Sequence, residues 1–336
     1  MSVSRQLRSA APLADGRVLV AGGRDGQGTP LITSEIYNPQ SGQWTSTGSL
    51  NAPHDHALLV GLADGAAIIG GDLPGHDTVL ESWSMASGEW TETVMPPFMS
   101  RVEGAWLAGD HLLVLCTPET ALDQMEFRSI DLTHGQVAGL PSPTIARSGT
   151  LNCRLADGRI LLASGASSGI GTGGAPVEFL TRECEVYDVA AEKWSPVGDL
   201  RVPHRSLDRG AQCLVALPDG GALMVSGSDE GGQSAYTDVV ERWSIVTGVW
   251  RTGAPLTELR DAHTTTVLSD GSVLVVGGEG PAGVQSDCQL YDVAVDSWSS
   301  ADDLNLPRLG HVSVPLTDGS VLVIDGAGNG TCELYN

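Results

Sequence analysis

Residues 270–278 read DGSVLVVGG, and residues 318–326 read DGSVLVIDG. Each copy joins an Asp-Gly turn to an apolar, β-branched run, which is typical of a hairpin that enters a buried strand. Further copies of this pattern begin at Asp15, Asp64, Asp157 and Asp219, and a degenerate copy begins at Gly109. This recurrence predicts a repeat protein whose unit is built from strands.

A second pattern recurs in each unit: an acidic residue, an aromatic residue two positions later, and a tryptophan seven positions after the aromatic residue. The complete sets are Glu35/Tyr37/Trp44, Glu81/Trp83/Trp90, Glu185/Tyr187/Trp194, Glu241/Trp243/Trp250 and, with glutamine in place of the acid, Gln289/Tyr291/Trp298. The third unit keeps the spacing with Ile130 and Val137, and a seventh set begins at Glu333 and Tyr335. Strong agreement of spacing and residue type indicates one structural unit that is used seven times.

The strand-rich unit, its double glycine and its spaced aromatic residues resemble the Kelch repeat, over essentially the whole chain. The resemblance implies an all-β, seven-bladed Kelch-type β-propeller, similar to the central domain of galactose oxidase, with four-stranded blades around a central channel. It also implies a single propeller domain over residues 1–336, although length alone suggests about two domains. The expected blades are 5–50, 54–97, 101–144, 147–200, 209–256, 260–304 and 308–336.

Alignment of the units makes two further structural predictions. Met1 stands where other units end their fourth strand, so the seventh blade is expected to have three strands. The regularly spaced Trp44, Trp194, Trp250 and Trp298 are expected to be largely buried between blades. Trp106 lies outside the pattern and is expected to be exposed or to face a site.

Composition limits the partners of the chain. Eighteen Lys and Arg residues against 41 Asp and Glu residues give a net charge of −23, which opposes binding to nucleic acid or to an anionic membrane. The first residues, MSVSRQLRSA, include no apolar signal segment, and no long apolar run follows, so we expect a cytoplasmic protein. Six cysteines without a CxxC pair are expected to be buried thiols, and no metal or other cofactor is expected.

Loop lengths vary most at one end of the predicted blades. That end carries the b–c loops, between the second and third strands of a blade, and the d–a links, between one blade and the next. Variable loops on a rigid scaffold commonly carry function. Gly169, Gly171 and Gly174 in one b–c loop match a dinucleotide-binding fingerprint. A strand, and not the required helix, is predicted to follow, so a simple loop or lid is favoured.

Basic residues share one repeat position, ten residues before the Asp-Gly turn. They are Arg5, His54, Arg147, Arg209, Arg260 and Arg308, with Arg101 at a similar place in the third unit. Around the channel mouth they could bind carboxylate or phosphate groups, or each could pair with the Glu of its own third strand. Because Arg128 and Gln289 replace that Glu, Arg101 and Arg260 are expected to lack the partner and to be the better ligand residues.

Two classes of function fit these residues. The first is a binding module that takes a peptide or a small anionic molecule at the channel mouth formed by the b–c loops and d–a links. The alternative is a small-molecule enzyme, an isomerase, lyase or cyclase, with acid–base chemistry carried by Asp261, His263, His54 and His56. Propellers host both classes, and the consecutive Tyr-His pair of Kelch-like copper radical oxidases does not occur here.

Overall fold

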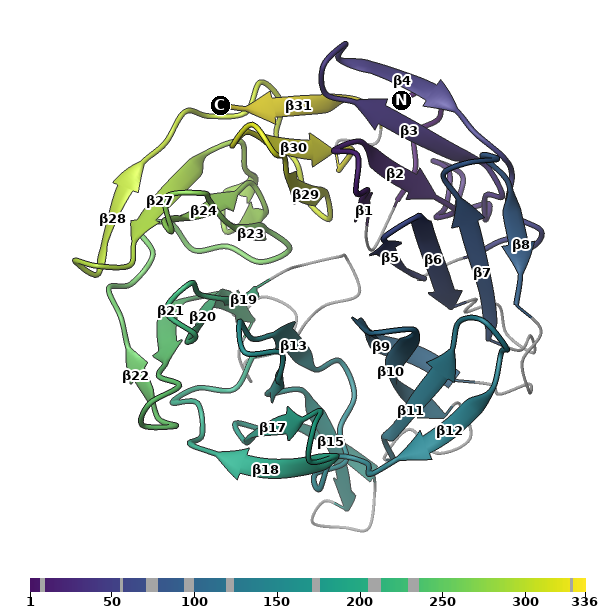
Figure 1. Cartoon of the computed structure of the whole chain (residues 1–336). Helices are drawn as coiled ribbons and strands as arrows, with labels where there is room; N and C mark the ends of the chain where they lie inside the picture. Colours follow the sequence, from purple (N-terminus) through teal and green to yellow (C-terminus); the bar gives the residue numbers. More distant parts are fainter. Residues whose placement is uncertain are drawn as a thin grey trace. The chain divides into compact units, whose positions relative to one another are not determined.

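The computed structural model describes residues 1–6, 10–54, 57–70, 78–93, 100–118, 124–170, 176–204, 213–228, 236–326 and 329–336. Strands are the regular elements of these residues, and short turns and loops connect them (Figure 1). In this described part of the chain, no helix has the length and apolar character that crossing a membrane requires.

The Asp-Gly turns form because the aspartate holds the backbone that follows it. The Asp270 carboxylate accepts hydrogen bonds from the Ser272 amide at 2.9 Å and from the Ser272 hydroxyl at 2.6 Å. Between them Gly271 adopts a φ of +87°, which side chains other than glycine rarely tolerate. Asp318 and Ser320 repeat these two hydrogen bonds in the last blade. Each turn therefore directs the chain from the first strand of a blade into the second.

Six sheets have four antiparallel strands in sequence order, and a seventh sheet has three. The first blade contains β1 (Ala11–Pro12), β2 (Val18–Ala21), β3 (Ser34–Asn38) and β4 (Gln43–Ser46). The second contains β5 (Leu58–Leu62), β6 (Gly65–Gly70), β7 (Val79–Ser84) and β8 (Trp90–Glu92). The third contains β9 (Ser100–Ala108), β10 (His111–Pro118), β11 (Glu126–Asp131) and β12 (Val137–Leu140).

The later blades follow the same order. The fourth contains β13 (Leu151–Arg154), β14 (Ile160–Ala163), β17 (Cys184–Asp188) and β18 (Lys193–Val197). The fifth contains β19 (Leu214–Ala216), β20 (Ala222–Ser228), β21 (Tyr236–Trp243) and β22 (Trp250–Thr252). The sixth contains β23 (Thr264–Val267), β24 (Val273–Val276), β27 (Cys288–Asp292) and β28 (Ser297–Ser300). The seventh contains β29 (Val312–Pro315), β30 (Val321–Ile324) and β31 (Cys332–Tyr335).

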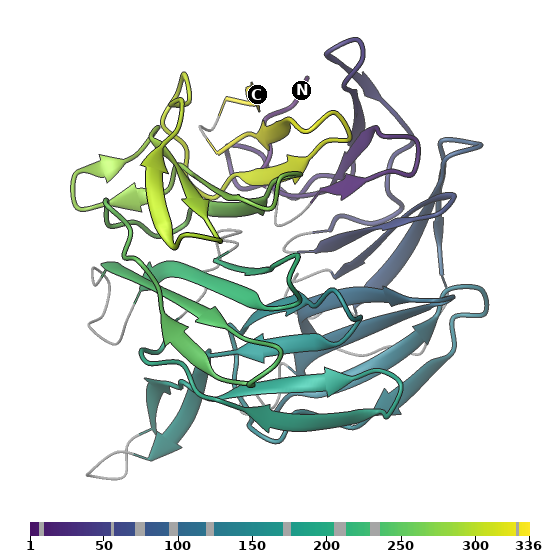
Figure 2. The same ribbon diagram turned by 60° about the vertical axis from the view of Figure 1, so that its left-hand side comes forward.

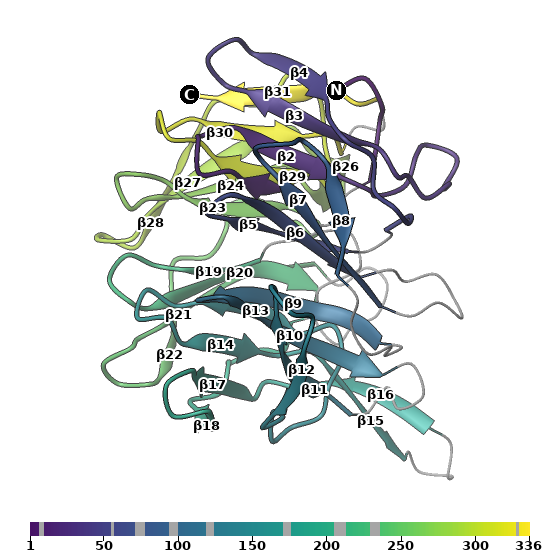
Figure 3. The ribbon, with the colours of Figure 1, turned by 45° about the vertical axis from the view of Figure 1, so that its right-hand side comes forward.

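This arrangement confirms the predicted fold class, an all-β seven-bladed β-propeller whose seventh blade has three strands. Two b–c loops form additional hairpins, β15 (Ala166–Ile170) with β16 (Pro176–Leu180), and β25 (Glu279–Gly280) with β26 (Gly283–Val284). The β15–β16 hairpin extends beyond the sheet of the fourth blade (Figures 2 and 3). Gly169 of the glycine-rich stretch lies in β15, Gly171 and Gly174 lie outside the described residues, and the next described element is a strand.

The chain forms two compact units. The first unit comprises Met1–Ala121, Glu126–Leu140 and His311–Asn336, and contains the first, second, third and seventh blades. The second unit comprises Leu122–Met125 and Pro141–Gly310, and contains the fourth, fifth and sixth blades.

Apolar side chains fill the space between neighbouring blades within each unit. In the first unit, Leu19 of the first blade and Ile68 of the second belong to one buried cluster. In the second unit, Leu161 of the fourth blade packs in one cluster with Met224 and Trp243 of the fifth. A single sheet could not bury both its faces, so stacking against the neighbouring blade supplies the core.

The tryptophan predictions are confirmed in part. Trp194 and Trp250 are buried, with 5% and 7% of their surface exposed. Trp44 and Trp298 lie on the outermost strands of their blades and are only partly buried, contrary to expectation. The prediction for Trp106 is wrong, because this side chain is buried and its ring meets the Phe127 ring edge-on at 6.4 Å.

Candidate ligand-binding site

The basic repeat position is occupied by buried side chains that pair with carboxylates in the first, second, fourth and sixth blades. Arg147 Nη2 lies 3.1 Å from Glu185 Oε2, and both side chains are fully buried. Arg5 makes the same contact with Glu35 at 3.1 Å and also donates to the Thr33 carbonyl at 2.7 Å. Burial lowers the pKa of both arginines. These guanidinium groups therefore connect strands within a blade.

The second blade uses histidine at this position. His54 Nε2 lies 3.0 Å from Glu81 Oε1, and both side chains are fully buried. Glu81 also accepts hydrogen bonds from the Asn51 amide at 2.8 Å and the Ala52 amide at 3.1 Å. The Glu81 carboxylate thus connects the segment that precedes the second blade to β7, the third strand of that blade. This contact favours a structural role for His54.

The expectation that Arg260 and Arg101 lack a carboxylate partner is wrong. Arg260 is fully buried and pairs with Asp287, which precedes Gln289 by two residues. Arg101 Nε lies 3.6 Å from Oε1 of Glu103, which follows it by two residues on β9. In the sixth blade the acid lies one step of the strand repeat earlier, whereas in the third blade it lies on the first strand instead of the third.

Where the structure describes them, the other predicted residues give no exposed basic group. Arg308 is fully buried. Arg209 and His56 lie outside the described residues. Asp261 and His263 are buried, with 3% and 0% of their surface exposed. The described positions of His54, Asp261 and His263 therefore do not support the enzyme alternative.

The Glu81 carboxylate predicts how stability responds to acid. Burial by itself raises the pKa of Glu81, but hydrogen bonds from His54, Asn51 and Ala52 outweigh burial, so its pKa is lowered. A carboxylate with a lower pKa in the folded state contributes stability at neutral pH, which is lost as the pH falls through the folded pKa. We expect the melting temperature at constant ionic strength to fall between about pH 5 and pH 3.

Glu81→Gln is the control for this titration. The variant is expected to melt at a lower temperature than the wild type at pH 7, because glutamine has no negative charge to strengthen the hydrogen bonds from His54, Asn51 and Ala52. Its further loss between about pH 5 and pH 3 is expected to be smaller than that of the wild type. Thermal melts followed by circular dichroism at each pH measure both effects. Equal losses in the two proteins would contradict the role of Glu81.

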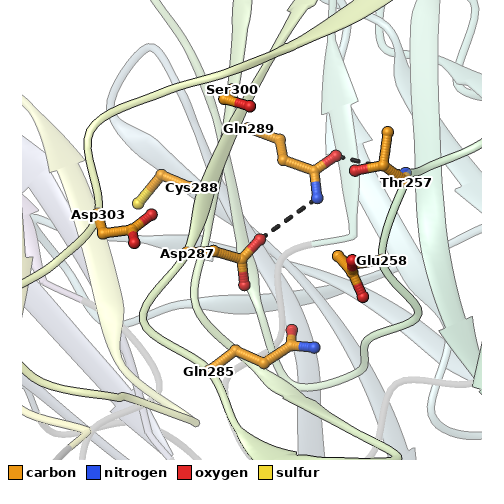
Figure 4. Close-up of a pocket in the computed structure, with 8 residues that line it drawn as sticks. All are labelled: Thr257, Glu258, Gln285, Asp287, Cys288, Gln289, Ser300 and Asp303. Carbon is orange, nitrogen blue, oxygen red and sulfur yellow. Dashed lines mark hydrogen bonds between the residues drawn. The ribbon is translucent and has the colours of Figure 1, made fainter.

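A pocket of about 380 Å³ lies in the second unit, at the end of the sixth blade where a b–c loop and two d–a links meet (Figure 4). Its lining residues are Thr257, Glu258, Gln285, Asp287, Cys288, Gln289, Ser300 and Asp303. The loops that form it belong to the two classes in which sequence variation predicted a site.

Oxygen acceptors dominate the pocket. Asp287 accepts a hydrogen bond from Gln289 Nε2 at 3.3 Å, with Glu258 and Asp303 on either side of this pair in Figure 4. Gln285 donates to the Leu259 carbonyl, while its own Oε1 is buried without a hydrogen-bond partner among the described residues. Such a surface suits a ligand that donates hydrogen bonds or carries positive charge.

The cysteine in the lining is not prepared for nucleophilic chemistry. Burial raises the pKa of the Cys288 thiol to about 12, so the thiolate is scarce at neutral pH. The described residues contain no group of three or more His, Cys, Asp and Glu side chains arranged to hold a metal ion.

Sequence reasoning located the blade but not the residues of this pocket. Gln289 stands where most blades have glutamate, and that departure singled out the sixth blade. It directed attention to Arg260, but the Arg260 guanidinium is already paired with the Asp287 carboxylate. Glu258 and Asp303 are in d–a links, where no repeat pattern marks them.

The Kelch motif family matches residues 8–51 of the chain, the segment that includes the first blade. This match and the seven-blade arrangement confirm the resemblance to Kelch-repeat β-propellers. A search of curated proteins gave no match. The fold is consistent with ligand or protein binding.

Proposed function

We propose that this chain is a Kelch-type binding module that holds a basic side chain of a peptide in the acidic pocket of the sixth blade. The pocket between the b–c loop and the d–a links carries this proposal. Glu258 and Asp303 are exposed acids at its edge, whereas the neighbouring Arg260 is buried against Asp287. A lysine or arginine side chain would meet carboxylates there with no competing free cation from the pocket lining.

A small anionic ligand is less well supported. Arg5, Arg147 and Arg260 are fully buried in carboxylate contacts, and a new anion would have to displace those carboxylates. The net charge of −23 also favours the approach of a cationic partner over an anionic one. The peptide is therefore the form of the binding hypothesis that the structure favours.

Exposed apolar side chains at the same end of the second unit's blades could extend the contact. Phe179 of β16 is 52% exposed, Val284 of β26 is 40% exposed, and Leu306 in the link after the sixth blade is 38% exposed. Peptide interfaces combine apolar contacts with a few oriented polar groups. We expect a peptide that carries apolar residues near its basic residue.

A peptide array tests the proposal. Peptides of equal length with a central arginine, lysine, norleucine or glutamate, and with varied apolar neighbours, are incubated with the full chain. Arginine and lysine peptides should be retained. Glu258→Gln and Asp303→Asn should each weaken the best peptide by roughly 1.5–5-fold, because exposed charge pairs contribute about 0.2–1 kcal/mol.

Glu92→Gln provides the matched control, since Glu92 is an exposed acid on β8, in the other unit. It changes the net charge equally and should leave peptide affinity unchanged. Added salt should weaken the wild-type complex, as expected for partly exposed charges. Preferential retention of glutamate peptides, or unchanged affinity in the two pocket variants, would exclude the proposed site.

We further infer that residues 1–336 act as one propeller domain and that the protein works in the cytoplasm. The repeat continues through both units, which supports the first inference. All six cysteines are free thiols, as is usual in a reducing compartment, which supports the second.

A further inference from the structure

The side chain of Gln285, in the lining of the acidic pocket, is held in a fixed position. Its Nε2 donates to the Leu259 carbonyl at 3.2 Å, and its backbone carbonyl accepts a hydrogen bond from the Arg308 amide at 3.0 Å. The backbone at Gly280 of β25 packs against the side-chain amide, because a Cβ there would come within 2.6 Å of Gln285 Nε2. These contacts determine which way the amide of Gln285 faces.

The carbonyl end of this amide is available to a ligand. Gln285 Oε1 is buried and accepts no hydrogen bond from the described residues. Leaving a buried acceptor unpaired costs free energy, and a ligand that supplies an N–H recovers this cost. Because Gln285 lines the pocket, a bound ligand can gain affinity here by a hydrogen bond to a neutral group.

Asp287 contributes a carboxylate oxygen to the same pocket. Its Oδ2 accepts hydrogen bonds from Arg260 and Gln289, and no described residue donates to its Oδ1. The Asp287 side chain is 32% exposed, so it remains accessible from the pocket. In Figure 4 the carbonyl oxygen of Gln285 is on the side of the amide that faces Asp287 and Glu258. The pocket thus presents a neutral acceptor together with carboxylates.

Arginine and lysine differ in how they can use these acceptors. The arginine guanidinium is planar and has five N–H donors, so it can donate to a carboxylate and to a carbonyl at the same time. The lysine ammonium is a compact, strongly hydrated charge, and it loses more when it gives up water for a neutral carbonyl. Carboxylates alone would attract both side chains, whereas the additional buried carbonyl favours arginine.

We propose that the pocket of the sixth blade selects arginine over lysine, and that Gln285 determines this specificity. The inference rests on the proposed binding of a basic side chain. Glu258 and Asp303 attract either cation, and the Gln285 carbonyl distinguishes between them. The bound guanidinium donates one N–H to Gln285 Oε1 and another to Asp287 Oδ1.

Fluorescence anisotropy with labelled peptides that differ only in their central residue tests the selection. The central residue is arginine, lysine or dimethylarginine. The arginine peptide is expected to bind the full chain about fivefold more tightly than the lysine peptide, which is the ratio that one net hydrogen bond provides. Dimethylarginine keeps the charge but has fewer N–H donors, so its peptide should lose most of this advantage.

Two variants separate the hydrogen bond from the charge. Methionine is similar in length to glutamine but has no carbonyl, so Gln285→Met should reduce the preference for arginine to within about twofold and leave lysine affinity unchanged. Glu258→Gln should weaken the arginine and lysine peptides by the same factor and retain the preference. Gln40→Met is the matched control, since Gln40 is exposed in the first blade, in the other unit, and should retain the wild-type ratio.

The outcomes distinguish this inference from the proposed function. Equal affinity of the wild type for arginine and lysine peptides, with both weakened by Glu258→Gln, would overturn the selection and leave the basic-peptide site standing. An undiminished arginine preference in Gln285→Met would overturn the role of Gln285. If that variant does not fold, the dimethylarginine peptide decides, because wild-type affinity for it equal to that for arginine would overturn the proposal. Binding of none of the peptides would overturn both the selection and the site.

Discussion

Replacement of Arg147 by alanine is expected to lower the free energy of unfolding by about 3–5 kcal/mol, because it leaves a buried carboxylate without its cation. Arg147 and Glu185 are both fully buried, with 3.1 Å between Nη2 and Oε2. Glu185 also accepts a hydrogen bond from the Thr144 amide at 2.9 Å, so its charge holds the segment before the fourth blade. The substitution therefore disturbs both the blade and its connection.

Urea denaturation followed by tryptophan fluorescence and by circular dichroism measures this loss, and coincident transitions justify two-state analysis. Arg159→Ala is the comparison in the same blade, since the Arg159 and Asp157 side chains are 31% and 38% exposed, with 2.7 Å between Nε and Oδ2. Such a pair contributes about 0–1 kcal/mol. Similar small losses in both variants would show that burial of the Arg147 pair does not matter.

The fold could be predicted from the sequence because its signals are local and recur. The Asp270–Ser272 contacts and the Tyr37–Trp44 register each depend on residues a few positions apart in the chain. Repetition turns such short patterns into a statement about the whole protein. The three-stranded sheet of the seventh blade, which the alignment also predicted, is present in the structure.

The candidate site could not be predicted from the repeat because residues that interact in it do not stand at the repeat positions. Arg260 keeps an acidic partner although the repeat position holds Gln289, since Asp287 lies one strand step earlier. An alignment of the repeats compares each residue only with the residue at the same repeat position. It therefore does not show that an acid two residues earlier takes over the role. Glu258 and Asp303 meet in one pocket only through the conformation of two links, which no periodic pattern describes.

Trp106 illustrates the same limit in the core. The third blade has Ile130 and Val137 where most blades have paired aromatic rings. Trp106 on β9 and Phe127 on β11 supply aromatic contact from other positions, with ring centroids 6.4 Å apart. The aromatic contact of this blade thus lies outside the repeat positions, and a residue outside the pattern was mistaken for a surface residue.

Trp194→Ala is expected to lower the free energy of unfolding by about 3–5 kcal/mol, because it removes a large buried ring and leaves a cavity. Only 5% of Trp194 is exposed, and its ring lies 5.1 Å from that of Tyr187 at an interplanar angle of 47°. The indole N–H donates to the Pro141 carbonyl at 2.8 Å, which fixes the segment that enters the fourth blade.

Trp194→Phe separates the ring from the hydrogen bond. Phenylalanine retains an aromatic contact with Tyr187 but cannot donate to Pro141, so we expect a loss of about 1–2 kcal/mol. Trp44→Ala gives a second comparison: Trp44 is only partly buried, and less of its ring is withdrawn from water than in Trp194. Its alanine variant should therefore lose less stability than Trp194→Ala in the same urea titration. If the two alanine variants unfold at the same urea concentration, the burial of the fourth-strand tryptophan does not determine how much it contributes to stability.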